Sequence, residues 1–179
     1  MPQPDPMVPE PAPMVAATPA DAADIARLRD RLAHWMIDNG IGQWLPGEYP
    51  AATVASEAAR GEWFVWRDSP GVLTAAVRLV WRDPEFWGED DTPAGYIHGL
   101  MVAPEFRGRD LGTRIIQFCA ARTLANGIAR QRLDTAADNS VLRKYYTAQG
   151  FTEIRETELP PQFHGTSHVV LMEKLLRMH

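Results

Sequence analysis

The stretch APEFRGRDLGTRI, residues 103–115, lies between an apolar run and a segment with helical periodicity. It contains two glycines and three arginines, a composition that suits a loop before the first turn of a helix. Unpaired backbone N–H groups and the positive end of the helix dipole make such a terminus a site for anions. The stretch therefore predicts an anion-binding loop, although Asp110 brings a negative charge into its middle.

The run from Val102 to Thr113 resembles the acyl-CoA loop of the GNAT N-acetyltransferase superfamily. The family pattern is Arg/Gln-x-x-Gly-x-Gly/Ala, between a strand that ends in valine and a helix. Arg107 and Gly112 occupy its first and last positions, and Asp110 replaces its first glycine. No Gly-Lys-Ser/Thr follows a glycine-rich loop, which excludes a P-loop NTPase.

A second stretch, NSVLRKYYTAQGF, resembles the family pattern Asn-x-x-Ala-x-x-Leu-Tyr-x-x-x-Gly-Phe. The matching positions are Asn139, Tyr146, Gly150 and Phe151. Leu142 and Tyr145 stand where alanine and leucine are usual, so Tyr145 is interpreted as a packing residue. The two motifs occur in the family's order, on segments whose patterns predict a loop before a helix and a second helix.

This resemblance implies acetyl-CoA as the cofactor. The residues implied to line the pyrophosphate, mainly through backbone N–H groups, are Arg107, Gly108, Arg109, Leu111, Gly112 and Thr113. The pantetheine arm is implied to pair with the backbone of Leu100, Met101 and Val102, and Asn139 to contact the cofactor through its side chain. Tyr146 is implied as a cofactor contact and as the acid that protonates the departing sulfur, with the Val102 N–H as the oxyanion donor.

A general base is sought on the strand before the loop. Regular alternation predicts two faces, one with Tyr96, His98, Leu100 and Val102 and the other with Ile97, Gly99 and Met101. Only His98 titrates near neutral pH, so it is the candidate base, with a packed core histidine as the alternative. His164 and His168 are the next candidates, because the family's last loop overhangs the acceptor site.

The family builds its acceptor pocket from the first two helices, the loop that joins them and the loop between the last two strands. The candidate acceptor contacts are Trp35, Trp44, Tyr96, Phe163 and His164. Aromatic side chains beside carboxylates suit an amine on an apolar or aromatic body. Core tryptophans and solvated acids are the alternative explanation, and no residue names the acceptor.

The local patterns predict an α/β fold with a central sheet of mixed direction, six to seven strands and flanking helices, in the order β-α-α-β-β-β-α-β-α-β-β. The expected strands are 14–17, 63–67, 72–81, 96–102, 132–135, 151–158 and 168–175. The expected helices begin after Thr18 and end before Asn39-Gly40, then cover 53–60, 112–126 and 140–149. Residues 1–13 are expected to form a disordered proline-rich leader, and 14–179 a single domain.

Composition narrows the function classes. The formal charge of −5 argues against a nucleic-acid partner, and no apolar run is long enough to span a membrane. The N-terminus lacks the basic and apolar regions of a signal peptide, so a cytoplasmic location is expected. The lone Cys119 is interpreted as a buried apolar residue, and no spacing of ligands predicts a metal. A homodimer is compatible with the family.

These observations predict an acetyl-CoA-dependent N-acetyltransferase that acts on the primary amine of a small molecule by direct attack in a ternary complex. Two alternatives remain open at this level. One is an acyl-CoA-binding regulatory module without turnover, and the other is a protein N-acetyltransferase.

Overall fold

The computed structural model describes residues 14–69, 71–163 and 165–177 of the 179-residue chain. The predicted leader and His164 therefore lie outside the described residues. The strands are β1 (Val15–Ala16), β2 (Trp63–Ser69), β3 (Val72–Val80), β4 (Gly95–Val102), β5 (Arg130–Ala136), β6 (Thr152–Glu158) and β7 (His168–Leu175). The helices are α1 (Ala22–Asp38), α2 (Ala51–Ala59), α3 (Pro84–Trp87), α4 (Leu111–Ala125) and α5 (Ser140–Ala148), with short 3-10 turns at Pro19–Asp21 and Pro104–Phe106.

The described strands form one seven-stranded sheet in the order β1-β2-β3-β4-β5-β7-β6. Every neighbouring pair is antiparallel except β4 and β5, which are parallel. The predicted α/β sheet of mixed direction is thus confirmed, as is the order of its main elements. The short helix α3 is an addition, because residues 82–95 read as an irregular polar loop in the sequence.

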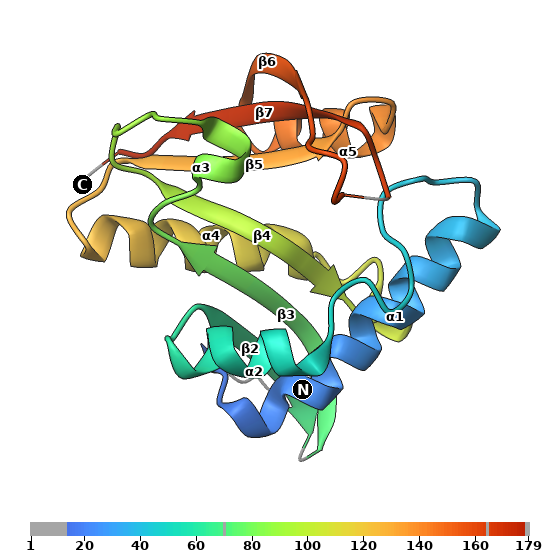
Figure 1. Ribbon diagram of the computed structural model, residues 1–179. Helices are drawn as coiled ribbons and strands as arrows, with labels where there is room; N and C mark the ends of the chain where they lie inside the picture. The colour runs from blue at the N-terminus through green and yellow to red at the C-terminus, as the bar shows by residue number, and fades with distance from the viewer. Residues whose placement is uncertain (1–13, 70, 164, 178–179) are drawn as a thin grey trace, which may run out of the picture.

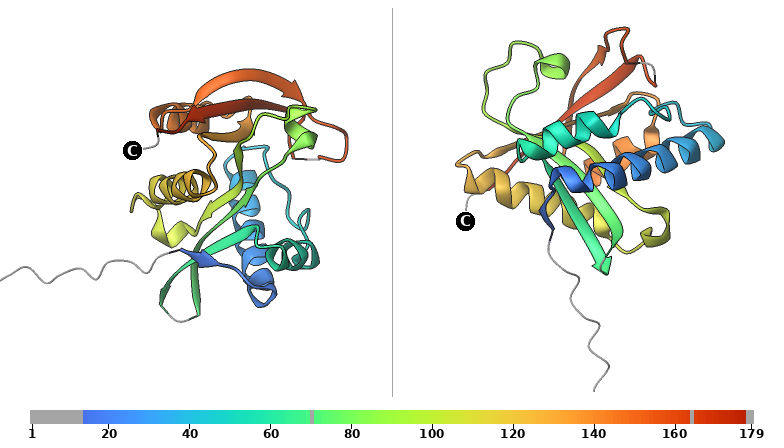
Figure 2. Two further views of the ribbon diagram at one scale, coloured as in Figure 1. Left: turned by 90° about the vertical axis from the view of Figure 1, so that its left-hand side faces the viewer. Right: turned by 60° about the horizontal axis from the view of Figure 1, so that its bottom comes forward.

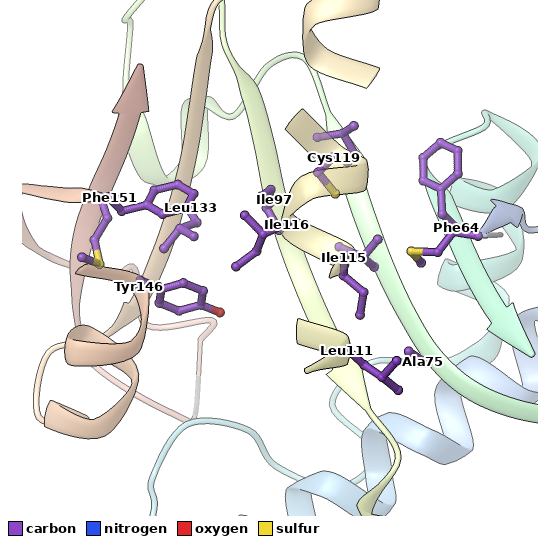
Figure 3. Close-up of a cluster of buried hydrophobic side chains, with 14 of the residues drawn as sticks. Phe64, Ala75, Ile97, Leu111, Ile115, Ile116, Cys119, Leu133, Tyr146 and Phe151 are labelled. Atoms are coloured by element: carbon purple, nitrogen blue, oxygen red, sulfur yellow. The ribbon is translucent and has the colours of Figure 1, made fainter. Parts of the chain in front are cut away.

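Helices cover both faces of the sheet (Figures 1 and 2). On one face, α4 and α5 pack on β2 to β5 and β7, and Figure 3 shows Ile115, Ile116 and Tyr146 in this cluster. On the other face, α1 and α2 pack on β2, β3 and β4. The alternation of β3 explains the division, because Ala75 and Val77 belong to the first cluster and Ala76 to the second.

Strands β4 and β5 pair only along their first residues. Their register runs from Gly95–Gln131 to Ile97–Leu133 and stops there. Beyond that point the two strands spread apart, as Figure 1 shows. The backbone of β4 from His98 to Val102 consequently has no strand partner on its β5 side among the described residues.

The regular alternation predicted for β4 is wrong, because the strand contains a bulge. Ala76 pairs with Met101 and Arg78 with His98, so β4 has one residue more than β3 between these pairs. Gly99 takes a positive φ of 53°, and a Cβ there would lie 3.0 Å from the Trp63 ring. Such a conformation and so close an approach both favour glycine.

The bulge reverses the faces of the residues that follow it. Leu100 and Val102 pack against the α4 cluster that contains Ile97, and Met101 packs against α1 and α2. Leu100 and Val102 therefore do not share a face with Tyr96 and His98, as a regular strand would require.

Candidate active site

A cavity of about 940 Å³ opens where β4 and β5 separate. Its volume is that of a pocket for a small molecule. Of the residues predicted from the sequence, His98, Leu100, Val102, Gly112, Tyr146, Trp44 and Phe163 line it. The cavity thus brings together the candidate acid, the candidate base and parts of both predicted binding regions.

His98 lies between two carboxylates at the point where the strands part. Its Nε2 is 3.0 Å from Asp83 Oδ2, and its Nδ1 is 3.5 Å from Asp134 Oδ1. Asp83 comes from the residue before α3 and Asp134 from the middle of β5. Burial opposes the charge of His98, but the contacts with Asp83 and Asp134 outweigh it and raise the pKa of His98 above its ordinary value.

Asp134 is itself perturbed. Burial raises the pKa of this carboxyl to about 6, the negative charge of Asp83 acts in the same direction, and the attraction to His98 opposes both. His98, Asp83 and Asp134 thus form a cluster of titratable side chains in the cavity lining, in which the two carboxylates favour the charged form of His98. The sequence places Asp83 among the carboxylates of the segments expected around the acceptor, but no motif connects Asp83 or Asp134 with His98.

Tyr146 extends from α5 into the core, and Figure 3 shows its hydroxyl turned toward β4. The ring packs edge-on against Phe151 and Tyr145, at centroid distances of 6.0 and 5.4 Å. Burial raises the pKa of the Tyr146 phenol, so the group stays protonated at neutral pH. It is therefore available as a hydrogen-bond donor to an atom in the cavity.

The loop before α4 contains one backbone position of unusual conformation, at its aspartate. Asp110 is the N-cap of α4 and has a left-handed φ of 56°, the one positive φ at a non-glycine position in the described residues. Aspartate tolerates this region better than most residues. Its side chain makes no cap hydrogen bond, and the residue is exposed, so the N-terminal N–H groups of α4 are not occupied by it.

The arginines around this loop lie on aromatic rings. Arg107 stacks over Trp35 at 3.8 Å from the ring centroid, Arg109 over Phe106 at 4.9 Å, and Arg114 over Trp66 at 4.7 Å. A cation–π contact holds such a side chain in place while the guanidinium keeps its charge. Trp35, predicted as an acceptor contact, is instead a support for Arg107 and is 38% exposed outside the cavity lining.

Gly112 and Thr113 contact α5. A Cβ at Gly112 would meet the Tyr145 hydroxyl, with the Tyr145 Cζ only 3.3 Å away, and the Thr113 hydroxyl accepts a hydrogen bond of 2.9 Å from Gln149. Tyr145 is thus a packing residue against the loop, as its position in the second motif suggested. Through these contacts, the motif before α4 and the motif of α5 pack against each other.

Asn139 caps α5. Its Oδ1 accepts from the Leu142 N–H at 3.1 Å, and its Nδ2 donates to Gln43 at 3.4 Å. The structure thus gives this side chain protein partners at both ends, and its predicted contact with the cofactor remains a prediction.

The predicted acceptor residues separate into two groups. Trp44 and Phe163 line the cavity, whereas Tyr96 does not. Tyr96 is only 2% exposed and packs against Trp87 of α3, with its hydroxyl accepting from Arg132 at 3.1 Å. The expectation that Tyr96 faces the acceptor is therefore not met, because α3 covers this part of β4. His164, the other predicted contact, is outside the described residues.

Three segments meet over the cavity, namely the loop between α1 and α2, the short helix α3 and the loop before β7. We call their residues Gln43, Phe86, Phe163 and Gly165 the cavity cover. Phe86 lies edge-on to Phe163 at 5.2 Å and 5.5 Å from the His98 ring. The backbone of Gly165 packs so closely on that of Gln43 that an added Cβ would lie 2.7 Å from the Gln43 carbonyl carbon.

A buried polar network forms the wall on the α1–α2 side. Glu57 accepts hydrogen bonds from the Tyr49 hydroxyl at 2.6 Å and the Trp63 indole at 2.7 Å, and lies 3.3 Å from Arg78. Glu62 binds the same guanidinium at 2.6 and 2.9 Å. Arg29 of α1 lies in this wall as well, beside Glu48.

Two features are absent from the described ranges. No group of three or more His, Cys, Asp or Glu side chains there is arranged to hold a metal ion. No helix among those residues has the length and apolar character needed to cross a bilayer.

Comparison with known proteins agrees with this geometry. The model of the acetyltransferase (GNAT) family matches residues 29–151. The uncharacterized N-acetyltransferase YesJ of Bacillus subtilis (strain 168) is 31% identical over 140 residues, which are 73% of this chain and 76% of that protein. The aminoglycoside N(6')-acetyltransferase type 1 of Stenotrophomonas maltophilia is 28% identical over 141 residues, 76% of this chain and 84% of that protein.

Solved structures share the fold. A GNAT-family acetyltransferase from Listeria monocytogenes 4b F2365 superposes with a TM-score of 0.75 at 24% identity, over 92% of this chain and 94% of that one. The yncA protein of Salmonella typhimurium, solved with its cofactor acetyl-CoA, gives a TM-score of 0.68 at 15% identity, over 93% of this chain and 95% of that one.

Proposed function

This chain belongs to the acetyltransferase (GNAT) family, and we propose that it transfers the acetyl group of acetyl-CoA to the primary amine of a small molecule by direct attack in a ternary complex. The observation that carries the proposal is the covered cavity, which joins the unpaired edge of β4 to Tyr146, His98 and a wall of aromatic and charged side chains.

The donor is acetyl-CoA, the cofactor of the Salmonella relative. Its pyrophosphate binds the backbone N–H groups at the N-terminus of α4, between Arg107 and Thr113. Its pantetheine arm pairs with the free backbone edge of β4 between His98 and Val102. This arrangement directs the thioester toward the fork of β4 and β5, where Tyr146 and His98 line the cavity.

The acceptor is a small amine. The cavity cover supports this class, because the three segments meet over the site, whereas a polypeptide terminus needs an open groove for the residues behind it. The aminoglycoside N(6')-acetyltransferase among the relatives also acts on a small molecule. Carboxylates in the cavity, Asp83 and Asp134 among them, favour a cationic nitrogen at the reaction centre.

The residues supply the proton transfers of aminolysis. The neutral form of His98 accepts a proton from the ammonium, directly or through one water, and the free amine attacks the thioester carbonyl carbon. The Val102 N–H donates to the oxyanion of the tetrahedral intermediate. As this intermediate collapses, the carbon–sulfur bond breaks, the Tyr146 hydroxyl donates its proton to the departing sulfur of coenzyme A, and the nitrogen of the new amide releases its second proton, which restores the Tyr146 hydroxyl.

Steady-state assays of coenzyme A release over a panel of amines test the proposal. We expect turnover with acetyl-CoA and at least one small primary amine, and an N-acetyl product by mass spectrometry. Tight binding of acetyl-CoA by calorimetry, without turnover of any amine or peptide, would instead support a regulatory module. Turnover of peptide N-termini alone would overturn the small-molecule assignment.

A further inference from the structure

We propose that Arg29 binds a carboxylate of the acceptor, so that the acceptor is an amino carboxylate such as an amino acid. This inference rests on the proposed function and narrows its substrate class. It starts from a cationic side chain in the cavity wall whose hydrogen-bonding capacity the protein leaves largely unused.

Arg29 lies on the inward face of α1. It follows Ile25 by four residues and precedes Leu32 by three, which places all three on one side of the helix. The residue is only 8% exposed, and yet it lines the cavity. A surface arginine would extend its charged end to water, whereas this one brings its guanidinium to the pocket.

The protein satisfies this guanidinium poorly. Within the described residues its one hydrogen bond joins Nη2 to Glu48 at 3.3 Å, longer than a strong charge-assisted bond. The Nη1 atom is buried and has no partner among those residues. The rings of Trp44 and Tyr49 lie 4.7 and 4.9 Å from Cζ, and the Tyr49 hydroxyl donates to Glu57 and makes no hydrogen bond with Arg29.

Arg78, the neighbouring arginine of the same wall, provides an internal comparison. It binds Glu62 through two hydrogen bonds and lies 3.3 Å from Glu57. Burial opposes the charge of both arginines, but interactions with Tyr49 and the two glutamates outweigh it at Arg78 and raise its pKa. At Arg29 burial prevails over Glu48 and lowers the pKa. Of these two arginines, Arg29 is the one that lacks a full set of anionic partners.

A carboxylate is the group that best completes this site. The guanidinium plane presents parallel N–H donors that match two carboxylate oxygens, and a buried unpaired donor is costly until it is satisfied. The ammonium of the same acceptor also needs a partner. Asp83 and Asp134, in a different part of the cavity wall, suit this group. A polycation without a carboxylate would leave Nη1 of Arg29 without a partner.

Matched amines test the proposal directly. We compare kcat/KM for amino acids with aromatic, aliphatic and basic side chains and for the amines obtained by removing their carboxylate, such as phenylalanine against 2-phenylethylamine. We expect at least one pair to favour the carboxylate-bearing member by about tenfold or more, the size of a charge-assisted hydrogen bond. Phenylalaninamide, which keeps the shape without the charge, should behave like the decarboxylated amine.

Variants of Arg29 test whether this residue causes the preference for a carboxylate-bearing acceptor. Arg29→Gln should abolish the preference, so that the two members of each pair have similar kcat/KM, whereas Arg29→Lys should restore part of it, because a point charge lacks the planar fork. Arg27→Gln removes the same charge from the exposed face of α1 and should change neither value. If both Arg29 variants fail to fold in thermal unfolding, the wild-type comparison decides alone.

A binding experiment separates this inference from the proposed function. N-acetylphenylalanine and N-acetyl-2-phenylethylamine are titrated by calorimetry into protein saturated with coenzyme A, together with the matching products of the other pairs. Preference for the carboxylate that Arg29→Gln removes would support the site even if no amine turned over. Equal binding in every pair, with equal kcat/KM, would overturn it, and a buried water would then account for Nη1.

Discussion

His98 Nδ1 lies 3.5 Å from Asp134 Oδ1, one residue beyond the last pair that holds β4 and β5 together. Because these residues are next in register after Ile97 and Leu133, their side chains meet where the strand pairing ends and the cavity begins. A pKa of His98 raised by Asp83 and Asp134 follows from this position.

The pH profile should report this contact. The base acts in its neutral form, so kcat/KM with a fixed amine should fall as pH drops through the raised pKa of His98, above the ordinary histidine value of about 6.5. Asp134→Asn removes a negative charge that raises this pKa, so the acidic limb should move to lower pH. Asp138→Asn, the same change in the exposed turn after β5, should leave the limb in place. A limb that does not move in Asp134→Asn would assign the titration to another group.

Tyr146→Phe should lower kcat by about a hundredfold, a typical contribution of a positioned general acid. The KM for acetyl-CoA should change much less, because the lost proton donor acts on the leaving sulfur. Tyr145→Phe is the matched control on the preceding residue, and we expect it to keep most of kcat. Stopped-flow or steady-state assays with both variants measure the difference, and a fully active Tyr146→Phe enzyme would exclude the acid role.

Asp110→Gly should keep the KM for acetyl-CoA or lower it a few-fold. The substitution removes a negative charge beside the pyrophosphate and suits the left-handed φ of 56°. Asp110→Asn removes the charge and keeps much of the backbone tolerance, whereas Asp110→Ala should destabilise the fold by about 1 kcal/mol because alanine is strained there. Thermal unfolding and KM measurements distinguish the two effects. A large rise in KM for both the glycine and asparagine variants would mean that the carboxylate assists binding.

The contact between Gly165 and Gln43 should control acceptor binding. A Cβ at Gly165 would overlap the Gln43 backbone, so Gly165→Ala must separate two loops of the cavity cover. We expect kcat/KM for the acceptor to fall by roughly tenfold through misplacement of the bound amine, with little change in KM for acetyl-CoA. Gly42→Ala is the control at the same junction, because its Cβ would meet Gly165 O at an ordinary 3.5 Å. Equal effects of the two variants would argue against a specific role for the cover.

Local chemistry made much of this fold predictable from the sequence. Apolar periodicity predicted α1, where Ile25, Leu28 and Leu32 are buried, and the turn after Asp68 predicted the β2–β3 hairpin. Predicted helix and strand ends differ from the structure by a few residues at most. The left-handed Asp110 fits a property of its residue type.

Features that depend on tertiary contact were not predictable in the same way. The bulge at Gly99 follows from pairing with β3 and the nearby Trp63, and alternation read from one strand has no access to either. Asp83 and Asp134 are 51 positions apart in the chain, and only the fork and α3 bring them to His98. Arg29 left one signal, a charge on the apolar stripe of α1, which is the pattern to look for in related sequences.

The extra residue at Gly99 divides β4 into two segments whose side chains alternate in different phases. Residues before Gly99 lie beside α3, Asp83 and Asp134. After it, Leu100 and Val102 pack against α4, along the backbone edge proposed to bind the donor. Because the alternation changes phase between them, His98 and Leu100 do not lie on the same face of the sheet, although they are two positions apart. The bulge thus lets one strand carry the candidate base on one face and anchor its C-terminal end to α4 on the other.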